Sequence, residues 1–355
     1  MRDIPRRVMT RGLRCLVCAI AAAFGIRALP AQPEYGAREA FIKNFDFTGR
    51  LVPGIPPKGR RIRVVIDTDA ANEIDDQWAI ALALLSPERF QIEGFVAANF
   101  DNDHGGPQGI AKSYEEIRRV LDKGGFGNRY PVFRGSDPMR YKFEPSESEG
   151  VDFIIRTAMK SPREDPLWIV GLGAATDLAS AYLKEPEIRN RARFFWHGRT
   201  QWPVKCSNFN VFGDRLAAAF LFGAPVPFVL FDTGTNLTCP MEESAKFVRP
   251  YGDLGAYLHE YRRTNPWFMQ PDKGFYDLGD IAALLDPGIA KWEVTGCPEV
   301  DPDLSYRFKG TKGSILRCAS IRRDAAFKLL YDRLKAAYPG KTGAPESGLT
   351  AGTRP

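Results

Sequence analysis

The stretch RVVIDTDAANEIDD, from Arg63 to Asp76, joins a short apolar run to two pairs of carboxylates. The apolar run predicts a buried strand that ends in Asp67-Thr68-Asp69. The amphipathic pattern from Asp75 to Leu85 predicts a helix, and a second apolar run from Ile92 to Ala97 predicts another strand. The stretch is therefore typical of the start of a β-α-β unit.

The same alternation continues along the chain. Candidate strands lie at 130–133, 167–172, 193–196 and 227–231, and helical patterns lie at 151–159, 176–183 and 216–222. Because the strand runs are continuously apolar, they are typical of parallel strands that helices cover on both faces. The pattern predicts one α/β domain over residues 61–338, with a mostly parallel central sheet flanked by helices. Ligands of such sheets bind at the carboxyl ends of the strands.

The composition is that of a soluble globular protein. The chain has 355 residues, of which 44% are hydrophobic and 26% charged, and this excludes a disordered or fibrous protein. The formal net charge is +6, but most of it lies in residues 1–31, where six arginines accompany a single aspartate. The rest of the chain lacks the basic excess typical of nucleic-acid binding, so we expect no nucleic-acid partner.

Residues 1–31 have the order of a secretory signal peptide. An arginine-rich start precedes an apolar stretch from Cys15 to Ile26, and small residues follow at Ala28 and Ala31. The apolar stretch is shorter than the roughly 20 residues that span a bilayer. We therefore expect an exported protein, periplasmic or secreted, that has no membrane contact after cleavage. A short membrane anchor is the alternative, and the general and twin-arginine export routes both stay open.

Two further segments fall outside the predicted domain. Residues 32–60 lack periodicity and predict an extended segment that leads into the domain, whereas residues 339–355 have the composition of a disordered tail. The cysteines beyond the leader do not have the spacing of a zinc site. A disulfide between Cys297 and Cys318 and buried free thiols are equal alternatives. The four cysteines are Cys206, Cys239, Cys297 and Cys318.

The carboxylates of the first β-α-β unit suggest a metal site. Asp67, Asp69, Asp75 and Asp76 fall within ten residues, at the end of a strand and the start of a helix. They would repel one another strongly unless a cation were present. Acidic residues at a helix start are favoured by the helix dipole, which explains Asp75 and Asp76 but not the other two carboxylates. Oxygen ligands without His or Cys favour Ca²⁺ or Mg²⁺ over zinc.

This stretch resembles the signature of the inosine-uridine-preferring nucleoside hydrolase family. The family signature is a strand that ends in D-x-D, followed by P-G-x-D-D-A at the start of a helix. Asp67-Thr68-Asp69 and Asp75-Asp76 match its acidic residues, while the loop Ala70 to Ile74 is two residues longer than in the family. The resemblance implies a Rossmann-like nucleoside hydrolase fold.

Later segments resemble the family in the same order. They are the end of the second strand at Asn99, the strand-to-helix turn from Ile169 to Ala179, the segment Ser207-Asn208-Phe209-Asn210, and the segment from Gly279 to Pro287. The resemblance implies a Ca²⁺ cofactor and three groups of site residues. Asp69 would be the general base. The ligands of Ca²⁺ would be Asp69, Asp76, the carbonyl of Leu172 and Asp280. The substrate would be bound by Asp75, Asn99, Asn208 and Asn210.

The chain departs from the family pattern at two of these positions. Asn208 stands where the family has a sugar-binding glutamate, and Gly279 stands where it has a histidine that assists the departing base. The glycine predicts that an aryl riboside, whose leaving group needs no proton, reacts faster than inosine. Asp277 is a rival to Asp280 as the closing metal ligand, and His197, at the end of a strand, could reach the site.

The predicted function is the hydrolysis of the N-glycosidic bond of a ribonucleoside or related ribosyl compound. A non-catalytic sugar- or nucleoside-binding protein with the same fold is one alternative. A phosphatase of the haloacid dehalogenase type, which also carries D-x-D at a strand end, is another. The expected partner is a small-molecule nucleoside or ribosyl compound, and a homo-oligomer is an open alternative to a monomer. The scattered histidines His104 and His259, and the tryptophans Trp196, Trp202 and Trp267, favour packing roles over chemistry.

Overall fold

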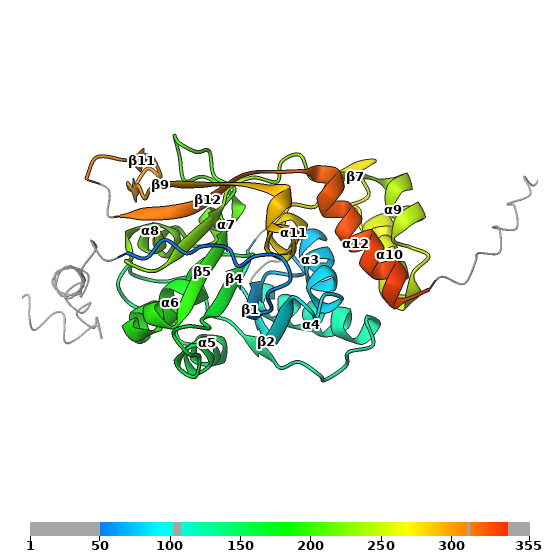
Figure 1. Ribbon diagram of the computed structural model, residues 1–355, viewed down its shortest axis with the longest axis horizontal. Coiled ribbons are helices and arrows are strands. Elements are labelled where there is room, and N and C mark those ends of the chain that lie inside the picture. Colours follow the sequence, from blue (N-terminus) through cyan, green and yellow to red (C-terminus); the bar gives the residue numbers. More distant parts are fainter. Residues whose placement is uncertain (1–49, 102–107, 311–312, 340–355) are drawn as a thin grey trace, which may run out of the picture. The chain divides into compact units, whose positions relative to one another are not determined.

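The computed structural model describes residues 50–101, 108–310 and 313–339, and a mixed sheet lies at its centre (Figure 1). Among these residues, eight strands form the sheet in the order β3-β2-β1-β4-β5-β6-β12-β9. All neighbouring strands are parallel except β12 and β9, which are antiparallel. The strands are β1 (Ile62–Thr68), β2 (Phe90–Ala97), β3 (Val132–Arg134), β4 (Leu167–Gly171), β5 (Ala192–His197), β6 (Phe228–Phe231), β9 (Ala290–Gly296) and β12 (Ser314–Ile321).

Helices flank the sheet, and the described part of the chain also has two small antiparallel ribbons. The ribbons pair β7 (Thr238–Pro240) with β8 (Asp272–Gly274), and β10 (Glu299–Val300) with β11 (Tyr306–Arg307). The helices are α3 (Asp75–Leu84), α4 (Gly109–Lys123), α5 (Glu149–Met159), α6 (Thr176–Lys184), α7 (Phe209–Gly213), α8 (Arg215–Gly223), α9 (Met241–Phe247), α10 (Gly252–Thr264), α11 (Leu278–Leu285) and α12 (Arg323–Ala337), with short 3₁₀ turns η3 (Pro186–Asn190) and η4 (Pro287–Ile289).

This architecture confirms the predicted α/β fold with a mostly parallel sheet. The six strands predicted from apolar runs correspond to β1 to β6, and the four predicted helices correspond to α3, α5, α6 and α8. The strand order reverses at β1, which lies between β2 on one side and β4 on the other. Because crossovers are right-handed, the helices that follow β1 and β4 cover opposite faces of the sheet. Ligands bind at the carboxyl ends of strands next to such a reversal.

Helix α3 brings the acidic residues into the interior. All ten of its residues are buried, which fits a helix that is apolar on every side apart from its first turn. It packs against the sheet and against α11 and α12, and the ring centroids of Trp78 and Phe275 are 3.9 Å apart. The first turn of α3 holds Asp75 and Asp76, which are 4% and 1% exposed. The packing of α3 therefore places two carboxylates where bulk water does not solvate them.

Several predictions for the ends of the chain fall wholly or mainly outside the described residues. These are the leader 1–31, most of the segment 32–60, His104, and residues 340–355 of the predicted tail. Residues 50–60 contain no helix or strand in the structure. Within the described ranges, every helix is too short or too polar to cross a bilayer. The structure favours the free-thiol alternative, because Cys206, Cys239, Cys297 and Cys318 are buried and unpaired with one another.

A buried arginine fastens residues 50–60 to the domain. The guanidinium of Arg89, which is 1% exposed, donates to the carbonyls of Leu284 at 2.7 Å, Pro57 at 2.9 Å and Pro56 at 2.8 Å. It also donates to the carbonyl of Arg60. The segment thus gains an anchor on α11 although it has no regular structure of its own.

We predict that Arg89→Met lowers the free energy of unfolding by at least about 2 kcal/mol, because buried carbonyls lose their donors. Urea unfolding measures this change. Arg333→Met, which removes an ion pair between Arg333 and Glu88 near the surface, should change it by less than about 1 kcal/mol. Equal stability of the Arg89 variant and the wild type would show that the anchor is unimportant.

Candidate active site

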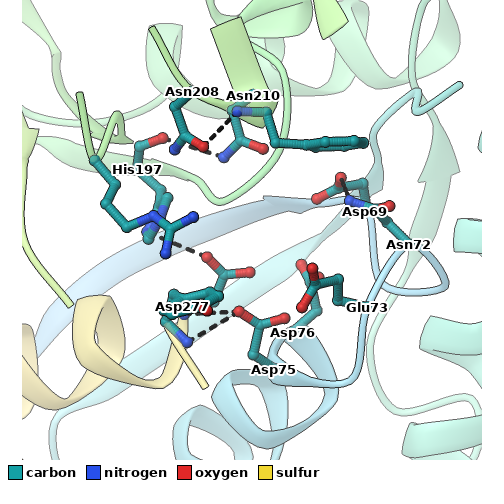
Figure 2. A pocket seen from close by; sticks show the side chains of 12 residues that line it. Asp69, Asn72, Glu73, Asp75, Asp76, His197, Asn208, Asn210 and Asp277 are labelled. Carbon is teal, nitrogen blue, oxygen red and sulfur yellow. Dashed lines mark hydrogen bonds and ion pairs between the residues drawn. The ribbon is translucent and has the colours of Figure 1, made fainter. Parts of the chain in front are cut away.

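A cavity with a mostly polar lining lies near the carboxyl ends of β1 and β5. Figure 2 shows the cavity and its lining. The lining residues are Asp69, Asn72, Glu73, Asp75, Asp76, His197, Arg199, Asn208, Phe209, Asn210, Tyr276 and Asp277.

One side of the cavity, here called the acidic wall, consists of Asp69, Glu73, Asp75, Asp76 and Asp277. The first four come from the loop after β1 and the start of α3, and Asp277 precedes α11. Two hydrogen bonds join these segments, because Oδ2 of Asp75 accepts from the backbone N–H of Tyr276 at 3.0 Å and of Asp277 at 3.3 Å. One carboxylate oxygen from each of Asp75, Asp76 and Asp277 lies within 4.8 Å of the others.

Two further oxygens of the acidic wall accept hydrogen bonds from residues nearby in the sequence. Asn72 donates from Nδ2 to Oδ2 of Asp69 at 2.9 Å. The hydroxyl of Thr68 donates to Oδ1 of Asp76. Asn72 belongs to the loop that is longer than in the family signature, so the extra length supplies a partner that orients Asp69.

Burial and mutual repulsion make it costly to ionise these carboxylates. Burial raises the pKa of Asp69 to about 7. Burial also raises the pKa of Asp76 well above its usual range, and the charges of Asp69 and Asp75 add to the effect. The pKa of Asp277 is raised in the same way by burial and by the charge of Asp75. The folded protein must therefore hold protons or a cation at this wall.

The residues of the acidic wall fit a divalent cation with hard oxygen ligands. Asp75, Asp76 and Asp277 offer converging oxygens from two separate segments, and all three are at least nine-tenths buried. Behind them, Asp67 is fully buried, and neither of its carboxylate oxygens has a hydrogen-bond partner among the described residues. This surplus of uncompensated oxygen atoms is the donor chemistry that Ca²⁺ or Mg²⁺ prefers.

The structure places Asp277 at the cavity and Asp280 beneath it. Asp280 lies inside α11, is fully buried and does not line the cavity. Its Oδ2 lies 2.6 Å from Nδ1 of His197, which is also 3.2 Å from Oδ1 of Asp277. Asp277 therefore lines the cavity, whereas Asp280, the closing ligand expected from the sequence, lies behind it and forms a second possible metal-binding group with His197 and Asp277. Asp280 contacts Asp277 through His197.

Gly279 also lies away from the cavity. A side-chain carbon at this position would come within 2.6 Å of Leu237 and 2.8 Å of Phe231, so packing inside the core requires a glycine here. Tyr276, three residues earlier, lines the cavity instead. The missing histidine therefore does not leave a gap at the site, because the aromatic side chain of Tyr276 reaches it.

Of the other predicted site residues, some line the cavity and others do not. Asn210 lines the cavity and donates from Nδ2 to the carbonyl of His197 at 3.1 Å and to that of Leu172. Leu172 itself is buried and is not part of the lining. Asn99 follows β2 and is half-buried, and it too is absent from the lining.

Asn208 lines the cavity, but its amide group is already used. Its Nδ2 donates to the carbonyl of Gly198 at 2.8 Å, and its Oδ1 accepts from the backbone N–H of Phe209 as the N-cap of α7. Figure 2 shows Asn208 and Asn210 across the cavity from Asp75 and Asp76. The role of Asn208 in this structure is to fix the loop at Gly198.

Sequence reasoning missed several lining residues, of which Arg199 is the most important. Arg199 follows the end of β5, and its position after a strand is the signal that could have identified it. Phe209, Asn72 and Glu73 also line the cavity. Of the tryptophans considered, Trp196 and Trp202 pack against other aromatic rings and Trp267 is 53% exposed. They do not line the cavity, nor does His259.

The chain matches the family model of the inosine-uridine preferring nucleoside hydrolases over residues 64–302. This range is more than half of the chain, and the chain belongs to that family. The resemblance found in the sequence is thereby confirmed at the level of the family. A search of curated protein sequences found no match.

Solved structures of nucleoside hydrolases share the fold. A plant nucleoside hydrolase is 20% identical, with a TM-score of 0.62, and the match covers 79% of this chain and 100% of that chain. A purine-preferring ribonucleoside hydrolase from Gardnerella vaginalis is 18% identical, with a TM-score of 0.61 and coverage of 78% and 98%. An inosine-uridine preferring nucleoside hydrolase from Bacillus anthracis is 17% identical, with a TM-score of 0.59 and coverage of 77% and 99%.

The raised pKa of Asp69 predicts how stability depends on pH without a metal. Between about pH 4 and pH 7 the folded protein holds a proton on Asp69 that the unfolded chain has released. The folded state binds more protons in this window, so the free energy of unfolding should fall as pH rises in the presence of a chelator. Ca²⁺ bound at this wall would replace the protons, so its stabilising effect should grow over the same range.

Melting temperatures measured from pH 5 to pH 8, with Ca²⁺ or with chelator, test this prediction. We expect the difference between the two conditions to widen as pH rises. Melting curves that coincide at every pH would show that the acidic wall binds no Ca²⁺.

Proposed function

We propose that this protein hydrolyses the N-glycosidic bond of ribonucleosides or related ribosyl compounds and depends on a divalent cation, with Ca²⁺ preferred. The observation that supports the proposal best is the convergence of Asp69, Asp75, Asp76 and Asp277 on one cavity. Membership of the nucleoside hydrolase family supports the reaction class. The arginine-rich leader supports export from the cytoplasm.

Asp76 and Asp277 would hold the cation, with Asp69 and Asp75 at its side. When bound, the cation would act as a Lewis acid that orients two ribose hydroxyls and lowers the pKa of a nearby water. Asp277 replaces Asp280 in this proposal because it lines the cavity. The Leu172 carbonyl remains a proposed ligand, since a carbonyl has a second lone pair beyond the one that Asn210 uses.

Asp69 would accept the proton of the attacking water. Its carboxylate lines the cavity, and Asn72 holds one oxygen at 2.9 Å, which leaves the other free to face the substrate. Burial raises the pKa of Asp69 to about 7 in the metal-free protein, and a bound cation would lower it, so that the carboxylate is ionised and can accept the proton. Asp75 and Asn210 would contact the sugar from opposite sides of the cavity.

Tyr276 would assist the departing base. A nucleobase leaves poorly as an anion and benefits from a hydrogen-bond donor, and the side chain of Tyr276 is available at the cavity. Gly274 leaves room for it, because a side-chain carbon at that position would lie 2.3 Å from the Tyr276 hydroxyl. With this donor, the protein would not be restricted to ribosides with activated leaving groups.

We predict that Asp69→Asn lowers kcat by about 10² to 10⁴, because an amide cannot accept the proton. The release of reducing sugar from inosine measures kcat, and circular dichroism confirms that the variant is folded. Asp324→Asn is the matched control, since Asp324 is an exposed surface residue. Near-normal turnover by the Asp69 variant would remove it from the role of base. If the wild type binds ribosides but does not cleave any of a nucleoside panel, the non-catalytic alternative would be favoured.

We predict that Tyr276→Phe lowers kcat/KM for inosine by about 10² but changes kcat/KM for p-nitrophenyl riboside by less than about threefold. The aryl leaving group needs no proton, so only the natural nucleoside should lose activity. Tyr130→Phe, a change in the packing against Phe95 away from the cavity, is the control. An equal loss on both substrates would mean that Tyr276 supports the fold or binds the sugar.

A further inference from the structure

Arg199 is a cavity residue that the proposed reaction does not use. It follows the end of β5, and its backbone φ of 37° lies in the left-handed region, which is unfavourable for a side chain of this kind. Strained residues of this kind persist only where the surrounding structure fixes them, and they cluster at functional sites. The strain at Arg199 therefore requires an explanation.

The loop that carries Arg199 is fixed on several sides. The backbone N–H groups of Gly198 and Arg199 both donate to the carbonyl of Phe231, at 2.9 Å and 3.0 Å. The hydroxyl of Thr200 donates to Asp232 at 2.8 Å, and that carboxylate is paired with Arg317 at 2.7 Å. These contacts hold Arg199 in place without using its own side chain.

The guanidinium of Arg199 is oriented but not neutralised. It lies over the ring of Tyr276, 3.8 Å from the centroid, so stacking fixes its plane and leaves its N–H edges available. It makes no ion pair with another described side chain. Its charge acts on Glu73, but the carboxylate of Glu73 is already paired with Lys273.

The two sides of the cavity differ in charge. The acidic wall contains every carboxylate of the lining, whereas the segment from His197 to Asn210 contributes Arg199 and two amides but no carboxylate. An anionic group on a ligand would be repelled by the carboxylates and attracted to the guanidinium of Arg199, which extends from the second segment to the ring of Tyr276.

The geometry of a β-riboside fits the difference in charge between the two sides of the cavity. Its 2- and 3-hydroxyls project from one face of the sugar ring, and its base and 5-carbon project from the other. With the hydroxyls at the acidic wall, the 5-substituent faces the segment that holds Arg199 and Asn208. A guanidinium with free N–H edges matches the oxygens of a phosphate in a bidentate arrangement.

We propose that Arg199 is a specificity residue that binds a 5-phosphate, so that the preferred substrates are ribosyl 5-phosphates such as nucleoside 5'-monophosphates. This inference rests on the proposed function for the orientation of the sugar.

Calorimetric titration in the presence of Ca²⁺ tests the proposal independently of turnover. Ribose 5-phosphate should bind the wild type at least about tenfold more tightly than ribose, as expected for charge-assisted hydrogen bonds. Arg199→Gln should abolish this difference, and Arg163→Gln, which changes an exposed arginine paired with Glu187, should retain it. Inorganic phosphate is a further probe, and its binding should be weaker than that of the ester. Equal affinity for ribose and ribose 5-phosphate in the wild type would overturn the proposal.

Kinetics separate this proposal from the proposed function. The wild type should cleave inosine 5'-monophosphate with a kcat/KM at least about tenfold higher than that for inosine, and Arg199→Gln should bring the ratio close to one. Cleavage of inosine without any preference for the monophosphate would overturn the role of Arg199 while leaving nucleoside hydrolysis in place. Absence of any cleavage, with selective binding of ribose 5-phosphate, would support the role of Arg199 and contradict the hydrolase.

Discussion

Repulsion among buried carboxylates at the end of β1 is the constraint on which the site depends. Asp67 lies within the sheet, paired in register with Val96 on β2 and Gly171 on β4, so it cannot turn toward water without disrupting β1. Burial raises its pKa well above the usual range, and the charges of Asp177 and Asp69 add to this effect. The fold cannot relieve the repulsion by exposing these groups, because α3 is also buried along its whole length. The cation that we propose at the cavity would offset this repulsion and would also take part in the reaction.

Buried residues beneath the cavity link the acidic wall to the segment on the opposite side, from His197 to Asn210. Asp277 is shared between the acidic wall and His197, which in turn contacts Asp280. His197 comes from β5, two residues before Arg199, so the same strand end contacts the carboxylate that we propose as a metal ligand and carries the guanidinium that we propose binds the substrate. Asn210 joins the two neighbouring strands by bonding to the carbonyls of Leu172 and His197. The acidic wall and the segment that faces it are therefore held in one fixed arrangement.

The sequence was sufficient for the six strands β1 to β6 and for the acidic residues of the first β-α-β unit, but it did not place β9 and β12 in the sheet. Continuous apolar runs identify buried parallel strands, and their carboxyl ends converge in any such sheet, so Asp69, Asp75 and Asp76 could be placed together in advance. The choice between Asp277 and Asp280 could not be made in this way. Residues three apart at a helix start share a face, and only the depth at which α11 packs decides which of them reaches the cavity.

The positions of three other residues could not be predicted either, because contacts between segments distant in the sequence determine them. Gly279 falls at the expected place in the motif, but the side chains of Leu237 and Phe231, distant in sequence, determine that it faces the core. The strained backbone of Arg199 is held by Phe231, and its side chain is oriented by Tyr276. The amide of Asn208 is used by Gly198. None of these pairings leaves a local pattern in the sequence.

We propose that Asp277, and not Asp280, completes a divalent cation site with the start of α3. A crystal structure of the protein grown with Ca²⁺ tests it most directly. We expect a density peak with oxygens of Asp76 and Asp277 at the calcium distance of about 2.3 to 2.6 Å, while Asp280 stays paired with His197. Absence of a peak, or a peak coordinated by Asp280 and His197 in place of Asp76, would contradict the account.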